Sequence, residues 1–73
     1  RITMEVPDRE GELAKVAQAI ADQGGYIAAC GTFASDDPTR WGLVLKVRNV
    51  SRDQLTDALE QIQDEKLLDV RES

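Results

Sequence analysis

The chain has 73 residues, of which nine are Lys or Arg and fourteen are Asp or Glu, so its formal net charge is −5. Residues 1–73 make one domain and leave no room for a separate catalytic domain, because domains usually comprise about 50–250 residues. The basic residues are too few and too scattered for a nucleic-acid module, and no apolar run approaches the roughly 20 residues that span a bilayer.

Cys30 is the only cysteine, and the chain contains no histidine. An internal disulfide and a cysteine zinc site are therefore excluded, and the commonest general base is missing. We expect no metal, no cofactor and no enzymatic activity, and a lone thiol suits the reducing cytoplasm. The chain begins at Arg1 instead of Met and runs straight into strand-like sequence, which indicates a module cut from a longer protein.

The first half of the chain predicts a strand, a helix and a second strand. Residues 2–6 alternate apolar and polar side chains, as a half-buried strand does. Residues 12–23 repeat apolar side chains at helical spacing, and Gly24-Gly25 ends this helix because glycine readily adopts the left-handed conformation. Residues 26–35 predict a strand with one face formed by Ile27, Ala29, Gly31 and Phe33 and the other by Ala28, Cys30, Thr32 and Ala34.

The second half predicts a strand, a helix and a last strand. The turn-rich residues 36–40 connect the second strand to residues 41–48, which alternate cleanly, so the two strands form an antiparallel hairpin. Ser51 stands three residues before Gln54, the spacing of a capping box, and opens a helix over residues 52–65. Residues 67–71 read as a short strand, with Leu68 and Val70 on one face.

The order β-α-β-β-α-β predicts an α+β, ferredoxin-like fold with a four-stranded antiparallel sheet and two helices on one face. The second strand, residues 26–35, lies at an edge of this sheet and carries no charged residue that would discourage association with another strand. The side chains expected to fill the space between the sheet and the helices are Ile2, Met4, Val6, Leu13, Val16, Ile20, Ile27, Phe33, Leu43, Leu45, Val47, Leu55, Leu59, Ile62, Leu68 and Val70.

The loop before the first helix is the first candidate site. A helix N-terminus offers free N–H groups and a positive dipole end to a carboxylate or a phosphate. Gly11 lets a ligand approach the backbone, and Asp8 is suited to receive an ammonium group. The same residues also suit a plain turn in which Asp8 caps, Gly11 bends the chain and nothing binds.

Asp8-Arg9-Glu10-Gly11-Glu12-Leu13 resembles the Asp-x-Pro-Gly-x-Leu signature that opens the first helix of ACT domains. The passage Gly24-Gly25-Tyr26-Ile27 and the hairpin around Asp36-Asp37-Pro38 are also similar to that family, and the resemblance covers essentially the whole chain. It looks closest to the ACT modules appended to paired CBS domains in bacterial proteins.

The resemblance implies a regulatory module without catalysis, which forms a homodimer side by side through its second strand. It also implies an amino acid or a similar small effector at the interface, between the first loop of one chain and the second strand of the other. The ligand-binding residues that the resemblance implies are Asp8, Arg9, Gly11, Glu12, Leu13, Ile27, Ala28 and Ala29.

Two departures from the family pattern leave alternatives open. The family's proline is Glu10 here, which adds negative charge beside a site meant for a carboxylate, and Ala28 and Ala29 lack a side-chain amide. The second hypothesis is therefore a dimerisation module of the same fold that binds nothing. A small enzyme of the acylphosphatase type is a third, which needs an anion cradle that the acidic loop does not resemble.

Two further features allow functional and structural interpretations. Asp36 and Asp37 are adjacent carboxylates that could bind a cation, although aspartates in such turns usually hydrogen-bond their own backbone. Trp41, beside Arg40, could cover a ligand or a partner surface, although an indole at the mouth of a hairpin usually closes the core.

Overall fold

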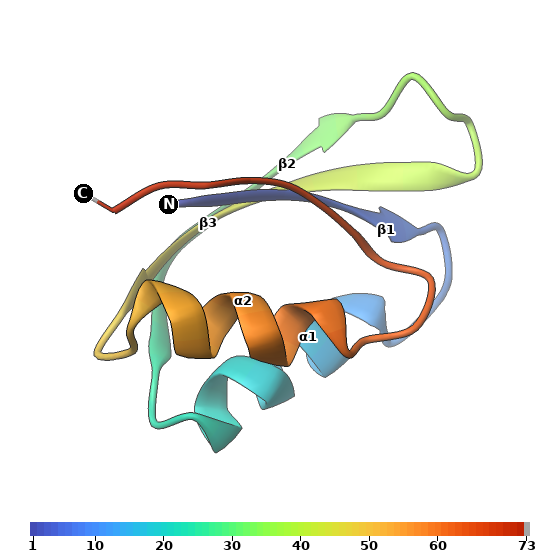
Figure 1. The fold of residues 1–73 in the computed structure, drawn as a ribbon. Helices are drawn as coiled ribbons and strands as arrows, with labels where there is room; N and C mark the ends of the chain where they lie inside the picture. Colours follow the sequence, from blue (N-terminus) through green and yellow to red (C-terminus); the bar gives the residue numbers. More distant parts are fainter. Residues whose placement is uncertain (73) are drawn as a thin grey trace.

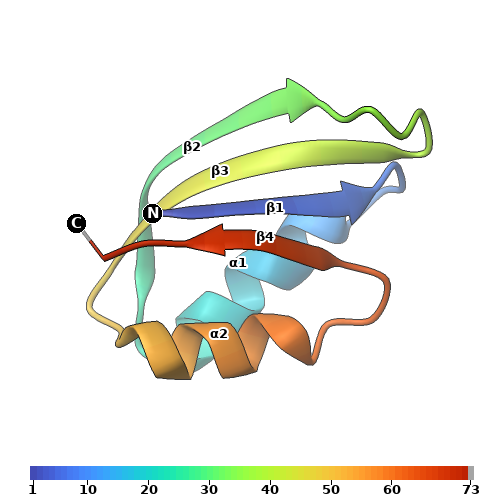
Figure 2. The same cartoon turned by 45° about the horizontal axis from the view of Figure 1, so that its top comes forward.

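The computed structural model describes residues 1–72, whose elements follow the predicted order (Figure 1). In chain order they are β1 (Ile2–Pro7), α1 (Glu12–Asp22), β2 (Tyr26–Ala34), β3 (Arg40–Arg48), α2 (Arg52–Glu60) and β4 (Lys66–Val70). The strands form one antiparallel sheet in the order β2-β3-β1-β4, with β2 and β4 at its edges. Both helices lie on the same face of the sheet (Figure 2). The ferredoxin-like α+β prediction is confirmed.

The core lies between the helices and the two central strands. Its buried apolar residues are Ile2, Met4, Val6, Val16, Ile20, Leu43, Leu45, Leu55 and Leu59. All nine belong to the set that the sequence predicts to face inward, so periodicity alone located the centre of the core. Among the described residues, no helix is long and apolar enough to cross a membrane.

The prediction for β4 is wrong at Leu68. The register of β4 against β1 shifts between Thr3, which faces Asp69, and Met4, which faces Leu67. Leu68 is therefore an extra residue in a β-bulge, and its side chain is 45% exposed, whereas Leu67 packs against the core. A bulge breaks the two-residue alternation from which the facing of Leu68 was predicted.

A second bulge, at Ala28, overturns the prediction for Phe33. Ile27 pairs with Val47 on the helix side, and after the bulge Phe33 pairs with Gly42 on the open face of the sheet. A Cβ atom built on Gly42 would stand 2.2 Å from the Phe33 ring, so the ring lies directly over this glycine. The phase of the alternation changes inside β2, and Ala29, Gly31 and Phe33 no longer share a face with Ile27.

The helix ends match the sequence except at the end of α2. Ser51 forms the predicted capping box: its hydroxyl accepts from the Gln54 N–H, and the Gln54 side chain accepts from the Ser51 N–H. The helix ends at Glu60 and not at residue 65, and the chain turns toward β4 with Asp64 at φ 70°. No glycine or proline marks this end, so the need to return to the sheet decides it.

Candidate functional site

The eight residues expected to bind a ligand lie at opposite ends of one molecule. β1 ends beside the start of β3, so the loop over residues 8–11 lies at the end of the sheet where β2 finishes. Ile27, Ala28 and Ala29 lie near the start of β2, at the other end. The views in Figures 1 and 2 agree on this arrangement. Within one chain the two groups therefore do not meet.

The loop presents an open helix N-terminus. Gly11 is the N-cap of α1, with φ 81°, and it supplies no side-chain hydrogen bond to the first turn. A Cβ atom at Gly11 would meet nothing within 4 Å, so the space beside this backbone is empty of other protein atoms. Asp8 is exposed, and its N–H donates to the Thr39 carbonyl at 2.9 Å, which holds the loop against the start of β3. The arrangement can receive a small anionic group at the helix end.

Leu13 and Trp41 flank this end of the sheet with apolar surface. The sequence predicts that Leu13 faces the core, and this prediction is wrong, because its side chain is 46% exposed. Trp41 is also 46% exposed, and it pairs with Val6 on the helix side of the sheet instead of closing the core. Both side chains are available to a ligand or to a partner.

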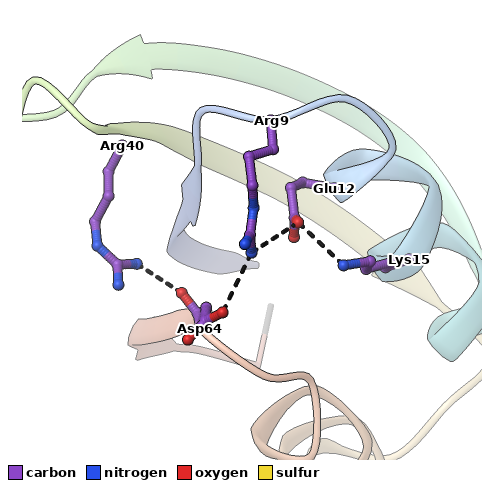
Figure 3. Close-up of polar contacts among 5 residues, drawn as sticks. All are labelled: Arg9, Glu12, Lys15, Arg40 and Asp64. Atoms are coloured by element: carbon purple, nitrogen blue, oxygen red, sulfur yellow. Dashed lines mark hydrogen bonds and ion pairs between the residues drawn. The ribbon is translucent and has the colours of Figure 1, made fainter.

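Glu12 takes the inward position that Leu13 was expected to fill. Its side chain is only 3% exposed, and its Oε1 lies 3.1 Å from the Arg9 guanidinium and 3.1 Å from the Lys15 ammonium (Figure 3). The side-chain hydrogen bond with Glu65, followed by that with Lys15, lowers the pKa of Glu12. Glu12 thus connects the loop residue Arg9 to Lys15 at the start of α1.

Glu65 is the acidic partner of Glu12 and belongs to the turn before β4. Neither Glu65 oxygen nor Glu12 Oε2 has a geometric hydrogen-bond partner among the described residues, although all three atoms are buried. Burial first, and then the Glu12 carboxyl, raise the pKa of Glu65 to about 8. A protonated Glu65 carboxyl can donate to the Glu12 carboxylate, and a proton shared in this way would give these buried atoms a partner.

The turn before β4 is tied to the loop by Arg9 and to the start of β3 by Arg40. Arg9 reaches Asp64 Oδ2 at 3.3 Å, and Arg40 donates to the Asp64 carbonyl at 2.9 Å (Figure 3). Arg9 is one of the predicted ligand contacts, and in this structure its guanidinium joins Glu12 to Asp64. Lys15, Asp64 and Glu65 are not among the residues predicted for the site. The sequence gives one signal for these contacts, the three-residue spacing between Glu12 and Lys15.

The strand residues of the candidate site lie along an open edge. Ala28 and Ala29 are exposed, and Ile27 is half-buried against the core. Because β2 pairs only with β3, its outer backbone groups have no ladder partner within the described chain.

The aspartates of the β2–β3 turn bond locally. Asp37 Oδ1 accepts from the Thr39 N–H at 2.8 Å and from the Thr39 hydroxyl at 2.6 Å, and these bonds lower the Asp37 pKa. The expected backbone bonding of this turn is confirmed at Asp37. No group of three or more Cys, Asp or Glu side chains that could hold a metal occurs in the described part of the chain.

Comparison with known proteins identifies the family. Residues 1–71 match the TTHA0829-like ACT domain, and the chain belongs to that family. Protein BT0572 from Bacteroides thetaiotaomicron has a similar fold, with a TM-score of 0.71 and 24% sequence identity over 92% of this chain. The match spans 43% of BT0572, so this chain corresponds to less than half of that protein. A search of curated proteins found no significant match.

Proposed function

We propose that this ACT domain is a non-catalytic regulatory module that forms a homodimer through β2 and binds an amino acid or a similar small effector at the interface. The observation that favours this most is the outer edge of β2. The strand has nine residues, most of them exposed, and no charged side chain. An uncharged free edge is a template for pairing with another strand.

Two-fold pairing would assemble the separated halves of the candidate site. If β2 pairs antiparallel with β2 of a second copy, the start of one strand lies opposite the end of the other. The partner's residues 27–29 then reach the end of the sheet where this chain carries residues 8–11 and Leu13. The site would contain residues of both chains, so ligand binding and pairing would depend on each other.

The chemistry of the loop fits a zwitterion. The open N-terminus of α1 suits a carboxylate, exposed Asp8 suits an ammonium group, and Leu13 suits an apolar side chain. Arg9 is held by Glu12 and Asp64 and would position the loop more than it would bind. Regulation would follow from linkage, because a ligand that binds the paired state better shifts the equilibrium toward it.

A ligand-free dimerisation module is the second candidate. Glu10 is exposed beside the helix N-terminus and opposes a carboxylate there, and Ala28 and Ala29 offer no polar side chain. This alternative keeps the β2 interface and discards the effector.

The experiment that separates the two candidates is a thermal melt at two protein concentrations, with and without each amino acid at millimolar levels. A ligand at 100 times its dissociation constant adds about 2.7 kcal/mol, which amounts to several degrees for a domain of this size. A shift with one amino acid supports the sensor. A melting temperature that rises with protein concentration but ignores every amino acid favours the ligand-free dimer, and independence from concentration contradicts both.

The substitution Leu13→Ser tests where such a ligand binds. Because Leu13 is exposed, its loss should leave the fold intact and reduce the effector-induced shift by about 1 kcal/mol or more. Leu68→Ser is the matched control, since Leu68 is equally exposed but lies on β4, at the other edge of the sheet. Equal responses of the two variants would remove Leu13 from the site.

The setting of the domain is part of the same proposal. A regulatory module acts on a parent protein, and attachment to paired CBS domains in a cytoplasmic protein stays a prediction. The exposed thiol of Cys30 suits a reducing compartment.

A further inference from the structure

Four of the nine basic residues of this acidic chain surround one cavity at the end of the sheet opposite the β1–α1 loop. The cavity has a volume of about 310 Å³ and lies between the start of β1, the β3–α2 turn and the end of β4. Its basic lining residues are Arg1, Arg48, Arg52 and Arg71, and its only acidic one is Glu72. These arginines come from three separate parts of the sequence, residue 1, residues 48–52 and residue 71, so the fold gathers them.

Three of the four guanidiniums have no anionic partner in the described chain. Arg71 pairs with Asp69 at 2.7 Å, whereas no ion pair joins Arg1, Arg48 or Arg52 to a carboxylate among residues 1–72. Of the five other basic residues, Arg9, Lys15 and Arg40 pair with acidic side chains, whereas Lys46 and Lys66 form no ion pair among residues 1–72. In a chain of net charge −5, unpaired arginines concentrated around one hollow produce a local positive field.

The case for anion binding in this cavity rests on its guanidiniums and not on the N-terminus of α2. Although the first turn of α2 lies in its wall, the capping box already satisfies the N–H groups of Ser51 and Gln54. Asn49 is also engaged, since its side chain donates to the Gly24 carbonyl at 3.0 Å. Arginine forks match the oxygens of phosphate-type anions, to which they donate two hydrogen bonds at once.

We infer that this arginine cavity is a second binding site, which takes a small phosphate-type oxyanion carrying at least two negative charges. Arg48 and Arg52, four residues apart across the β3–α2 turn, are its principal contacts, and Arg1 and Arg71 also line it. None of its residues belongs to the β1–α1 loop or to β2, although Val47 in its lining pairs with Ile27 of the candidate effector site. Its exposure makes the affinity sensitive to salt.

The test is a titration of the 73-residue chain with pyrophosphate, inorganic phosphate and acetate, followed by amide chemical shifts at constant low ionic strength. Pyrophosphate should bind more tightly than phosphate, and acetate should not saturate, with the largest shifts at residues 47–52 and 70–72. Arg52→Gln should weaken pyrophosphate binding by about three- to tenfold, and Arg48→Gln/Arg52→Gln by about thirtyfold or more.

Lys46→Gln is the matched control, because Lys46 lies two residues from Arg48 on β3 but outside the cavity. It should leave pyrophosphate binding within about twofold of the original. Equal losses in the control and the arginine variants, or no saturable binding of pyrophosphate, would overturn the inference. Binding of an acidic peptide in place of pyrophosphate would overturn it as well and indicate a protein partner. The melting temperature of every variant should still rise with protein concentration, which separates this test from that of the β2 dimer.

Discussion

The two edge strands of the sheet, β2 and β4, differ in length and in charge. β4 is a five-residue strand with Lys66 and Asp69 along it and Arg71 directly after it, whereas β2 has nine residues and no charge. Short, charged and bulged edges resist pairing with other chains. Both edges contain a bulge, so it is the charge and the length that distinguish them. From this comparison we expect that any association through backbone hydrogen bonds uses β2 and not β4.

The largest expected effect comes from placing the same charge on each edge. Gly31→Glu adds a carboxylate to the middle of β2, where a Cβ atom meets nothing within 4 Å, so the monomer should fold normally. In a two-fold pair the two new carboxylates repel one another, and we expect association to weaken by roughly ten- to a hundredfold. Sedimentation velocity over a concentration series measures this change.

Leu68→Glu is the reciprocal variant on β4. Leu68 is exposed in its bulge, so the substitution should leave both folding and association unchanged. If Leu68→Glu dissociates the dimer and Gly31→Glu does not, the assignment of the two edges is reversed.

The attachment of β2 to the sheet can be weakened at Gly42. A Cβ atom at this position would stand 2.2–2.4 Å from three atoms of the Phe33 ring, so Gly42→Ala must displace the ring from the open face. We expect a loss of about 1–2 kcal/mol in the free energy of unfolding, measured by urea denaturation. Gly31→Ala is the control, and its added methyl group should not change the free energy of the folded state. Unchanged stability of Gly42→Ala would mean that Phe33 contributes little to holding β2.

The free energy of unfolding should depend on pH through two carboxyls, Glu65 in the turn before β4 and Glu12 at the start of α1. Since folding raises the pKa of Glu65 to about 8 from 4.5, the folded state holds a proton that the unfolded state releases. The stabilisation is complete below pH 4.5 and is lost as the pH rises toward 8. Glu12 acts in the opposite sense, because folding lowers its pKa, so its contribution is lost as the pH falls below about 4.5.

Glu65→Gln should flatten the decline in the free energy of unfolding between pH 4.5 and pH 8. Urea denaturation midpoints at four pH values within this window would measure it. Glu60→Gln, an exposed carboxylate at the end of α2, should keep the original slope. If the decline persists in Glu65→Gln, the proton shared with Glu12 is not its source.

The elements and the centre of the core follow from the sequence, because helical and strand periodicity leave few other ways to bury Val16, Leu45 and Leu59. The errors at Leu68 and Phe33 have one cause: a bulge shifts the alternation by one residue, and neither bulge is marked by a glycine or a proline. The glycine of the β1–α1 loop correctly predicts where α1 begins, whereas the sequence does not predict the buried position of Glu12. The buried carboxylate of Glu12 pairs with its sequence neighbours Arg9 and Lys15 and lies beside Glu65, which is distant in the sequence and so could not be predicted.

The bulge at Ala28 also divides β2 into two parts that are under different structural constraints. Before it, Ile27 is fixed by the core and can change only with its neighbours. After it, Cys30, Gly31 and Thr32 are all exposed, so substitutions there cost the isolated fold little. This half of the strand is thus free to diverge among related chains under the demands of whatever binds it, while the hydrophobic interior stays the same.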